Sequence, residues 1–374
     1  MNTVLVRVFI GAHDAPSRKF FDAARGEIIG QYGKQCEFQV LNTDDMKRDP
    51  FRFTPAEFID WLIEGDVHVL VGHMHQGVDH LNWDMKTLLE EYKRLKDHVG
   101  YPRGAQDPVF LQDKIQYLEA LDAEDILPTL KVEMPLVSAN DEVLILESDL
   151  NAIIAFISQW GGTYKDGWVV KTPFTTHGSI YRNGIGSGSM YCNDLQEIAK
   201  RILCISRLSH HHFTGRRFAP NSISLPYIFI QPRVENSELK LLVINGEAKL
   251  HVCKATYSKA FKTNIHACYD FADKVVKKLK SVHSDLMIEY ILRVDLFEIS
   301  DGAGGSKLVV NEFESFDADF LQESEMRKKR KRDENWTDHS TENFILTFWV
   351  NKMKDLIEDQ LLSAGDQHIG VLHS

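Results

Sequence analysis

The sequence predicts an α/β (α+β) protein in which an amino-terminal parallel sheet is followed by antiparallel strands. Residues 1–100 alternate apolar runs rich in β-branched residues with runs of helical spacing. Further on, Asn245-Gly246 separates two apolar runs, and Asn-Gly is the favoured turn of a two-residue β-hairpin. A second pair of β-like runs, over residues 292–320, flanks a glycine-rich turn and carries several carboxylates.

Length and composition limit the classes of protein to consider. The 374 residues are enough for two or three domains, and 43% hydrophobic with 26% charged residues is typical of a soluble globular protein. A formal net charge of −11 argues against a protein that coats nucleic acid or anionic membrane. The five scattered cysteines fit reduced cytosolic thiols. The first residues lack a signal-peptide pattern, and no apolar run reaches the roughly 20 residues of a membrane span. We expect a cytoplasmic protein without membrane or nucleic-acid partners.

In the first hundred residues, strands are expected at 3–10, 37–41 and 67–71, with helices at 18–32, 55–64 and 84–96. Thr54 fits an N-cap, and Pro55 fits the first helical position. This order predicts a small parallel sheet with helices on both faces, whose ligands would bind at the carboxyl ends of the strands. The loops 11–17 and 72–80 lie there. The second loop holds His73, His75 and His80, which could form a metal site, contact a substrate or be plain surface histidines.

In the rest of the chain, helices are expected at 112–130, 149–160, 194–207, 269–280 and 344–362, and strands at 167–171, 226–232, 238–244 and 248–254. The strand 167–171 ends at Lys171 and enters a loop, 172–188, that is rich in Gly, Thr and Ser. Exposed backbone N–H groups and hydroxyls of such a loop can cradle phosphates, although the loop lacks the Walker A and GxGxxG patterns. A glycine-rich hairpin turn is the alternative.

The hairpin over residues 292–320 is a candidate metal site. Arg293 and Asp295 are two residues apart in one run, and Glu312 and Glu314 in the other, so each pair can share a strand face. Antiparallel pairing would bring three carboxylates together, and converging oxygen ligands suit Mg²⁺. The alternative is a charged hairpin with one solvated face.

Four segments, in order, resemble those of the ATP-grasp superfamily over about residues 110–320. They are Asp113-Lys114 ahead of Leu127-Pro128-Thr129, Val169 to Pro173 with the loop after it, Ile230 to Val234 with residues 239–247, and Arg293-Val294-Asp295 with Glu312-Phe313-Glu314. The resemblance implies an ATP-grasp fold behind an N-terminal Rossmann-like domain. The implied divisions are a front domain on the substrate side at 1–110, a small subdomain with a phosphate-covering loop at 111–225, and a subdomain with the Mg²⁺ site and closing helix at 226–374.

The resemblance also implies roles for individual residues, with ATP and Mg²⁺ as cofactors. Asp295, Glu312 and Glu314 would be the metal ligands, and Arg293 and Lys171 the catalytic residues. Glu238 would accept from the ribose, and the segment 231–234 would line the adenine. The residues implied in nucleotide binding are Lys114, Lys171, Thr175, Thr176, Gly178, Gln231, Pro232, Arg233, Val234, Glu238, Lys240 and Lys254.

The sequence departs from the family pattern at several of these positions. Glu314 stands where the family usually has Asn, and Pro232 where it often has Glu. The segment 173–178 has few glycines for a phosphate cradle. Lys240 and Lys254 replace arginines common in parts of the family, which loses bidentate geometry.

The resemblance implies an ATP- and Mg²⁺-dependent ligase that activates the carboxylate of a small molecule or peptide as an acyl phosphate for attack by an amine. One alternative is a kinase on the same scaffold, such as one acting on inositol phosphates. The basic residues for a polyanionic substrate would be Arg18, Lys19, Arg182, Arg216 and Arg217. A second alternative is a non-catalytic nucleotide-binding protein. The basic run from Arg327 to Arg332 fits a nuclear signal or nucleic-acid patch, an element near the active site that steers anionic substrates, or a solvated charge run.

Overall fold

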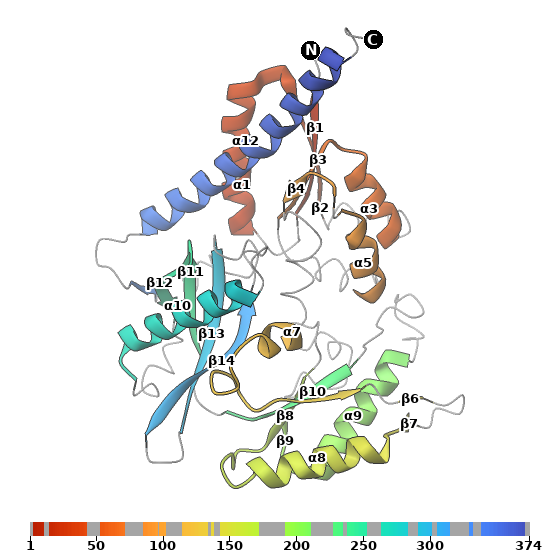
Figure 1. Ribbon diagram of the computed structural model, residues 1–374, viewed down its shortest axis with the longest axis vertical. Coiled ribbons are helices and arrows are strands. Elements are labelled where there is room, and N and C mark those ends of the chain that lie inside the picture. Colours follow the sequence, from red (N-terminus) through yellow and green to blue (C-terminus); the bar gives the residue numbers. More distant parts are fainter. Residues whose placement is uncertain are drawn as a thin grey trace.

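The computed structural model describes most of the chain as three larger sheets with helices packed on them (Figure 1). The described residues are 3–10, 15–42, 53–71, 85–95, 97–101, 114–133, 136–137, 143–171, 191–210, 227–234, 238–252, 263–282, 291–300, 305–314, 329–331 and 338–370. Among them, no helix is both long enough and apolar enough to cross a membrane.

The first sheet is parallel, as the strand and helix alternation predicts. Its strands, in the order β2-β1-β3-β4, are β2 (Cys36–Asn42), β1 (Val4–Ile10), β3 (Val67–Val71) and β4 (Gly100–Tyr101). Strand β4 was not predicted, since two residues give no periodicity. β3 is buried along its whole length, as expected of a strand covered on both faces.

Helices cover both faces of the first sheet, which confirms that prediction. They are α1 (Ala15–Tyr32) and α12 (Asp338–Gly370) on one face, and α3 (Pro55–Ile63) and α5 (Met85–Tyr92), continued by the 3₁₀ turn Lys93–Leu95, on the other. Strand alternation sends Val8 towards α1 and α12, and Phe9 towards α3 and α5. Helix α3 begins as predicted: the Glu57 N–H donates to Thr54 Oγ1, and the Thr54 N–H donates to the Glu57 carboxylate.

The second sheet is antiparallel and has its own core. Its strands, in the order β5-β10-β8-β9, are β5 (Leu130–Glu133), β10 (Tyr227–Pro232), β8 (Trp168–Lys171) and β9 (Tyr191–Cys192). Helices α8 (Glu147–Trp160) and α9 (Leu195–His210) pack on one face of this sheet through residues such as Ile153 and Ile202. The short pair β6 (Leu136–Val137) and β7 (Val143–Leu144) lies beside α9.

The predicted helix over residues 112–130 is wrong beyond Glu119. Helix α7 spans Lys114–Glu119, and Leu130 already begins β5. The residues between them contact the third sheet instead: the Val310 N–H donates to the Asp125 carbonyl at 2.8 Å, and the Asp125 carboxylate pairs with Lys274. Pro128 also lacks the N–H that a continuing helix requires.

The third sheet carries both predicted hairpins. Its strands, in the order β14-β13-β11-β12-β15, are β14 (Ser306–Glu314), β13 (Ile291–Ser300), β11 (Leu239–Ile244), β12 (Glu247–Val252) and β15 (Lys329–Lys331). Asn245 and Gly246 adopt φ values of 52° and 76°, as a type I′ turn requires. Helix α10 (Ile265–Val282) covers one face. Strand β15 belongs to the basic run and pairs with β12 at the edge of the sheet. The function of the basic run remains a prediction.

The third sheet and the first share one hydrophobic core. Leu242, Ile244 and Leu250 of β11 and β12 join the cluster that contains Val6, Val8 and the apolar side chains of α12. Helix α12 therefore packs mainly on α1 and the first sheet, although it follows the third sheet in the chain (Figure 1). The divisions at 1–110, 111–225 and 226–374 remain predictions.

Helix α7 bridges the second and third sheets. Ile115 packs against Tyr227 and Phe229 of β10, whereas Tyr117 and Leu118 enter the core beneath the third sheet. Figure 1 shows α7 between the two sheets. The first residue of this helix, Lys114, consequently lies where the sheets approach each other.

We expect Trp349→Ala to destabilise the protein by about 3 to 5 kcal/mol, because it removes a fully buried ring and leaves a cavity. Trp349 contacts the rings of Phe21, Tyr101 and Phe348. Denaturant unfolding measures the change. Leu362→Ala is the control on the same helix, since Leu362 is 71% exposed and its loss should cost less than about 0.5 kcal/mol. Equal costs for the two variants would contradict this packing.

Candidate active site

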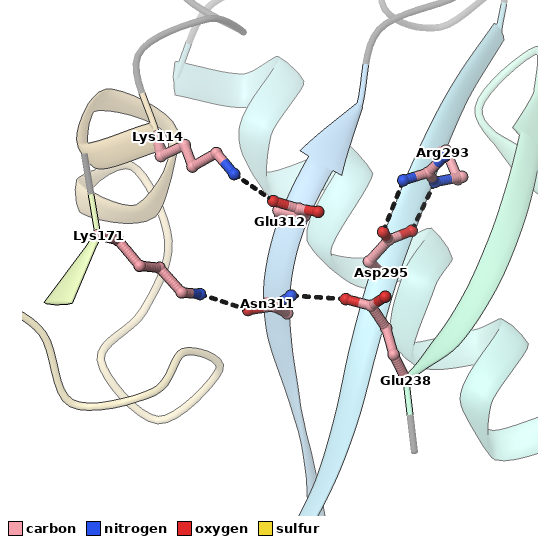
Figure 2. Close-up of polar contacts among 7 residues, drawn as sticks. All are labelled: Lys114, Lys171, Glu238, Arg293, Asp295, Asn311 and Glu312. Atoms are coloured by element: carbon pink, nitrogen blue, oxygen red, sulfur yellow. Dashed lines mark hydrogen bonds and ion pairs between the residues drawn. The ribbon is translucent and has the colours of Figure 1, made fainter. Parts of the chain in front are cut away.

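Seven polar side chains converge where α7 and β8 approach the third sheet (Figure 2). Lysines come from α7 and β8, and carboxylates come from the third sheet and the residue before β11. The set is Lys114, Lys171, Glu238, Arg293, Asp295, Asn311 and Glu312. The cluster therefore joins segments that are as many as 198 residues apart in sequence.

A β-bulge in the β13–β14 hairpin sets the positions of the β14 side chains. Asp295 pairs with Glu312, but the next residue, Leu296, pairs with Val310, so Asn311 is an extra residue in β14. A bulge interrupts the alternation of side chains and redirects them locally. Asn311 and Glu312 are consecutive in sequence, yet both contact residues of the same cluster (Figure 2).

The described residues hold a group of three carboxylates that could bind a metal ion. One oxygen from each of Glu238, Asp295 and Glu312 lies within 4.8 Å of the others. Asp295 is fully buried and Glu312 is mostly buried, so these oxygens converge in a site largely shielded from water. An all-oxygen donor set of this kind matches the preference of Mg²⁺.

Two lysines face these carboxylates. The Lys114 ammonium forms an ion pair with Glu312. The Lys171 ammonium donates to Asn311 Oδ1 at 2.9 Å, and Asn311 Nδ2 donates to Glu238 Oε1 at 2.6 Å. Asn311 thus links a lysine of the second sheet to a carboxylate of the third.

Arg293 holds Asp295 in a fixed orientation. Its Nε and one terminal nitrogen donate to the two Asp295 carboxylate oxygens at 2.7 and 2.8 Å, and both residues are buried. The predicted shared face of these two residues is therefore present. A bidentate guanidinium pair restricts the carboxylate more than a single hydrogen bond does.

Burial and like charges shift the acid–base behaviour of the site. Burial, and then Asp295 and Glu312, raise the pKa of Glu238 to about 8. Burial and the neighbouring Lys114 lower the pKa of Lys171 to about 8. Burial also raises the pKa of Asp295 against the opposing effect of Arg293. Burial disfavours the charged form of Glu312, yet Lys114 and Lys171 hold its pKa below the usual range.

The predicted adenine segment consists of the last two residues of β10 and the two residues after them. Gln231 is fully buried; its amide nitrogen donates to Thr129 Oγ1 at 2.9 Å, and its Oε1 has no partner among the described residues. The Arg233 N–H donates to the Gly167 carbonyl at 2.9 Å, and Val234 packs on the cluster around Leu127. Pro232 is the last residue of β10.

Of the remaining predicted site residues, two have their backbone beside the cluster, and others lie outside the described part of the chain. Lys240 lies opposite Asp295 in the β11–β13 register, beside the carboxylates. The backbone of Glu314 lies opposite Arg293, but its side chain is outside the described part of the chain. Also outside it are Thr175, Thr176, Gly178 and Lys254, together with His73, His75, His80, Arg182, Arg216 and Arg217.

The sequence reasoning missed Asn311 and gave Glu238 a different role. Glu238, predicted to contact a ribose, lies with the metal-type carboxylates. Asn311 was overlooked because regular alternation would turn it away from Glu312. The signal was present: two adjacent polar residues, Asn311-Glu312, interrupt the apolar run between Val310 and Phe313. Such an interruption indicates a bulge in an otherwise alternating strand.

The raised pKa of Glu238 predicts a pH effect on the stability of the metal-free protein. A carboxyl with a higher pKa in the folded state stabilises the fold at low pH, and this contribution disappears as pH rises from its unfolded pKa of 4.5 to about 8. Relative to the wild type, Glu238→Gln should become more stable across this window by on the order of 1 to 3 kcal/mol. Below about pH 7, Lys171 adds no slope because its ammonium is protonated in both states.

Denaturant unfolding in EDTA from pH 5 to about pH 8.5 measures this difference. Glu247→Gln makes the same change at an exposed position in the same sheet, and should follow the wild type. If Glu238→Gln also follows the wild type at every pH, the carboxylates do not repel one another as described.

Comparisons with family models and with curated protein sequences give no match. Solved structures do match. D-alanyl-alanine synthetase A from Vibrio cholerae is 11% identical, with a TM-score of 0.50 over 95% of this chain and 100% of that chain. D-alanine–D-alanine ligase from Bacillus anthracis is 11% identical, with a TM-score of 0.47 over 98% and 100%. The ATP-grasp ligase PsnB, complexed with a minimal precursor, is 13% identical, with a TM-score of 0.41 over 86% and 92%.

The match to the Vibrio cholerae structure extends over nearly the whole of both chains. At this level of identity the similarity concerns the fold, and it agrees with the order of motifs in the sequence. The comparison therefore shows that this chain shares its fold with that synthetase.

Proposed function

We propose that the protein is an ATP- and Mg²⁺-dependent ligase that activates a substrate carboxylate as an acyl phosphate for attack by an amine. The observation that carries the proposal is the meeting of two lysines with three carboxylates between the second and third sheets. The similar structure from Vibrio cholerae is named as a synthetase, which supports a ligase rather than another use of the fold.

The residues present fit a magnesium site. Glu238, Asp295 and Glu312 would hold the ion, and a cation there would offset the mutual repulsion that raises the pKa of Glu238. Bound Mg²⁺ neutralises charge that develops on transferred phosphoryl oxygens. Glu314 stays a proposed further ligand.

The chain's own basic groups would position the phosphates. Lys114 and Lys171 reach the carboxylates from α7 and β8, so a triphosphate between them would meet two ammonium groups. Lys171 is held on Asn311, and this contact limits where its ammonium can lie. Arg293 orients Asp295 and adds a fixed positive charge, which can stabilise negative charge that develops during transfer. Chemistry of this kind depends on position and charge, and the seven described side chains of the cluster supply charged and amide groups for it.

The nucleotide base would lie along Gln231 to Val234. The buried Gln231 Oε1 is a hydrogen-bond acceptor without a described partner, and a ligand N–H group would satisfy it. Lys240 would add positive charge beside Asp295. The loop that holds Thr175, Thr176 and Gly178 is the proposed cover of the phosphates, and Lys254 is a proposed phosphate contact. The substrate side would be formed by residues 1–110.

Product analysis tests the reaction class. The protein is incubated with Mg²⁺-ATP and a panel of amino acids, dipeptides and inositol phosphates, and ADP, free phosphate and organic products are measured. ADP with free phosphate and a new amide supports the ligase. ADP with a phosphoester and no free phosphate supports the kinase. Absence of Mg²⁺-ATP binding, measured as no shift in melting temperature at saturating nucleotide, supports a non-catalytic protein that does not use this site.

Glu312→Gln should lower ATP turnover about a hundredfold or more, because it removes the metal-type ligand charge and the partner of Lys114. The fold should persist, as measured by circular dichroism, since the change keeps the side-chain shape. Glu247→Gln should retain wild-type turnover. Near-normal ATP turnover in Glu312→Gln would contradict the proposed assignment of the metal site.

Asn311→Leu should lower the turnover number by about tenfold to a hundredfold, with a smaller change in KM for ATP. Leucine has a similar shape but removes both the 2.9 Å acceptor for Lys171 and the 2.6 Å donor to Glu238. Steady-state kinetics measure the split between the two constants. Gln39→Leu makes the matched amide-to-leucine change on β2 and should leave both constants unchanged. A rise in KM alone would show that Asn311 serves binding and not positioning.

A further inference from the structure

A polar cavity lies at the end of the second sheet that is opposite Lys171. Its lining comes from β9, the first turns of α9 and the residue that follows β10, and its volume is about 530 Å³, within the range of small-ligand sites. At this end of the sheet Trp168 pairs with both Cys192 and Pro232, whereas Lys171 pairs with Phe229. The three steps from Trp168 to Lys171 span about 10 Å along β8, so this cavity and the carboxylate cluster are separate places.

Positive charge dominates the lining of this cavity. Lys200, Arg201 and Arg233 line it, and Glu197 is the acid among the described lining residues. The Glu197 carboxylate caps the start of α9, where it accepts a hydrogen bond from the Asn193 N–H at 2.7 Å. A concentration of three cations is notable in a chain whose formal net charge is −11. Such a concave basic surface attracts anions.

Arg233 is held in place by its neighbours. Its guanidinium carbon lies 4.2 Å from the centre of the Tyr191 ring, and its backbone N–H donates to the Gly167 carbonyl. A guanidinium stacked on an aromatic ring points its N–H groups sideways, in the plane that phosphate and carboxylate oxygens match. Ordering this side chain before a ligand arrives lowers the entropic cost of binding.

The start of α9 forms one wall of the cavity and is capped by its own carboxylates. The helix has 16 residues, and Asn193 and Glu197 at its beginning line the cavity. Two carboxylates already offset the partial positive charge of this N-terminus, because the Asn193 N–H donates to Glu197 and the Glu197 N–H donates to Asp194 Oδ1 at 2.8 Å, so the three cations carry the positive potential of the cavity. Burial raises the pKa of the adjacent Cys192 thiol to about 11, so this sulfur is neutral and does not oppose an anion.

We propose that this cavity binds a small polyanion carrying two or more phosphate or carboxylate groups, at a site distinct from the lysine and carboxylate cluster. The proposal goes beyond the ligase reaction and does not depend on it. A ligand there would touch Tyr191, which follows residues 172–190, and Arg233, which belongs to the predicted adenine segment.

Isothermal titration with inorganic pyrophosphate, without divalent cation, tests the proposal on the full chain. The double variant Lys200→Gln/Arg201→Gln should weaken binding by about tenfold or more, since it removes two charge-assisted contacts. Lys171→Met removes an ammonium group of the lysine and carboxylate cluster, so it lowers any pyrophosphate binding there, whereas the binding that the double variant weakens should persist in it. Lys277→Gln removes one exposed helical charge on α10 and is the matched control.

Three outcomes overturn the proposal: no measurable binding of pyrophosphate, a loss with Lys171→Met but not with the double variant, or an equal loss with Lys277→Gln. The second would assign the anion to the lysine and carboxylate cluster, and the third to non-specific charge. If circular dichroism shows that the double variant is unfolded, Lys200→Gln alone decides. Its side chain is exposed, and its loss should weaken binding about threefold.

Discussion

The crowding of Glu238, Asp295 and Glu312 is the constraint on which the rest of the site depends. Three carboxylates whose oxygens lie within 4.8 Å of one another repel strongly in a buried place, and the protein surrounds them with compensating groups. Arg293 and Lys114 form ion pairs with Asp295 and Glu312, respectively. The amide of Asn311 donates a hydrogen bond to Glu238. Each of these groups also restricts the position of the carboxylate that it contacts, so the contacts that offset the repulsion also order the site.

This arrangement relies on apolar packing on either side of it. The face of the third sheet opposite the carboxylates packs on α10, and its β11–β12 end joins the core of the first sheet. Helix α7 is held through Ile115 on one side and Tyr117 on the other, and Tyr117 meets the Phe313 ring that follows Glu312. A shift of either sheet would therefore move a lysine away from its partner.

Local signals in the sequence were sufficient where the structure is decided locally. The Thr54 cap, the Asn245-Gly246 turn and the alternation of the first three strands depend on neighbouring residues, and these predictions are confirmed. The helix over 112–130 failed because Asp125 contacts β14, a partner nearly two hundred residues away. The position of Asn311 failed for a similar reason: a bulge changes the register between strands, and period-two reasoning assumes that register. Residues that meet through tertiary contacts, such as Glu238 with Asp295, give no spacing signal at all.

The packing of α12 on the first sheet has a consequence for how the protein is made. The last strand of the first sheet ends at Tyr101. Part of one face of this sheet is covered by Trp349 and its neighbours, which follow almost 250 residues later. At a synthesis rate of roughly 5 to 20 residues per second, the part of this face that α12 covers lacks its partner for more than about ten seconds, whereas α1 is already available to cover the rest. Part of the core of the first sheet is thus completed only after the second and third sheets have been synthesised.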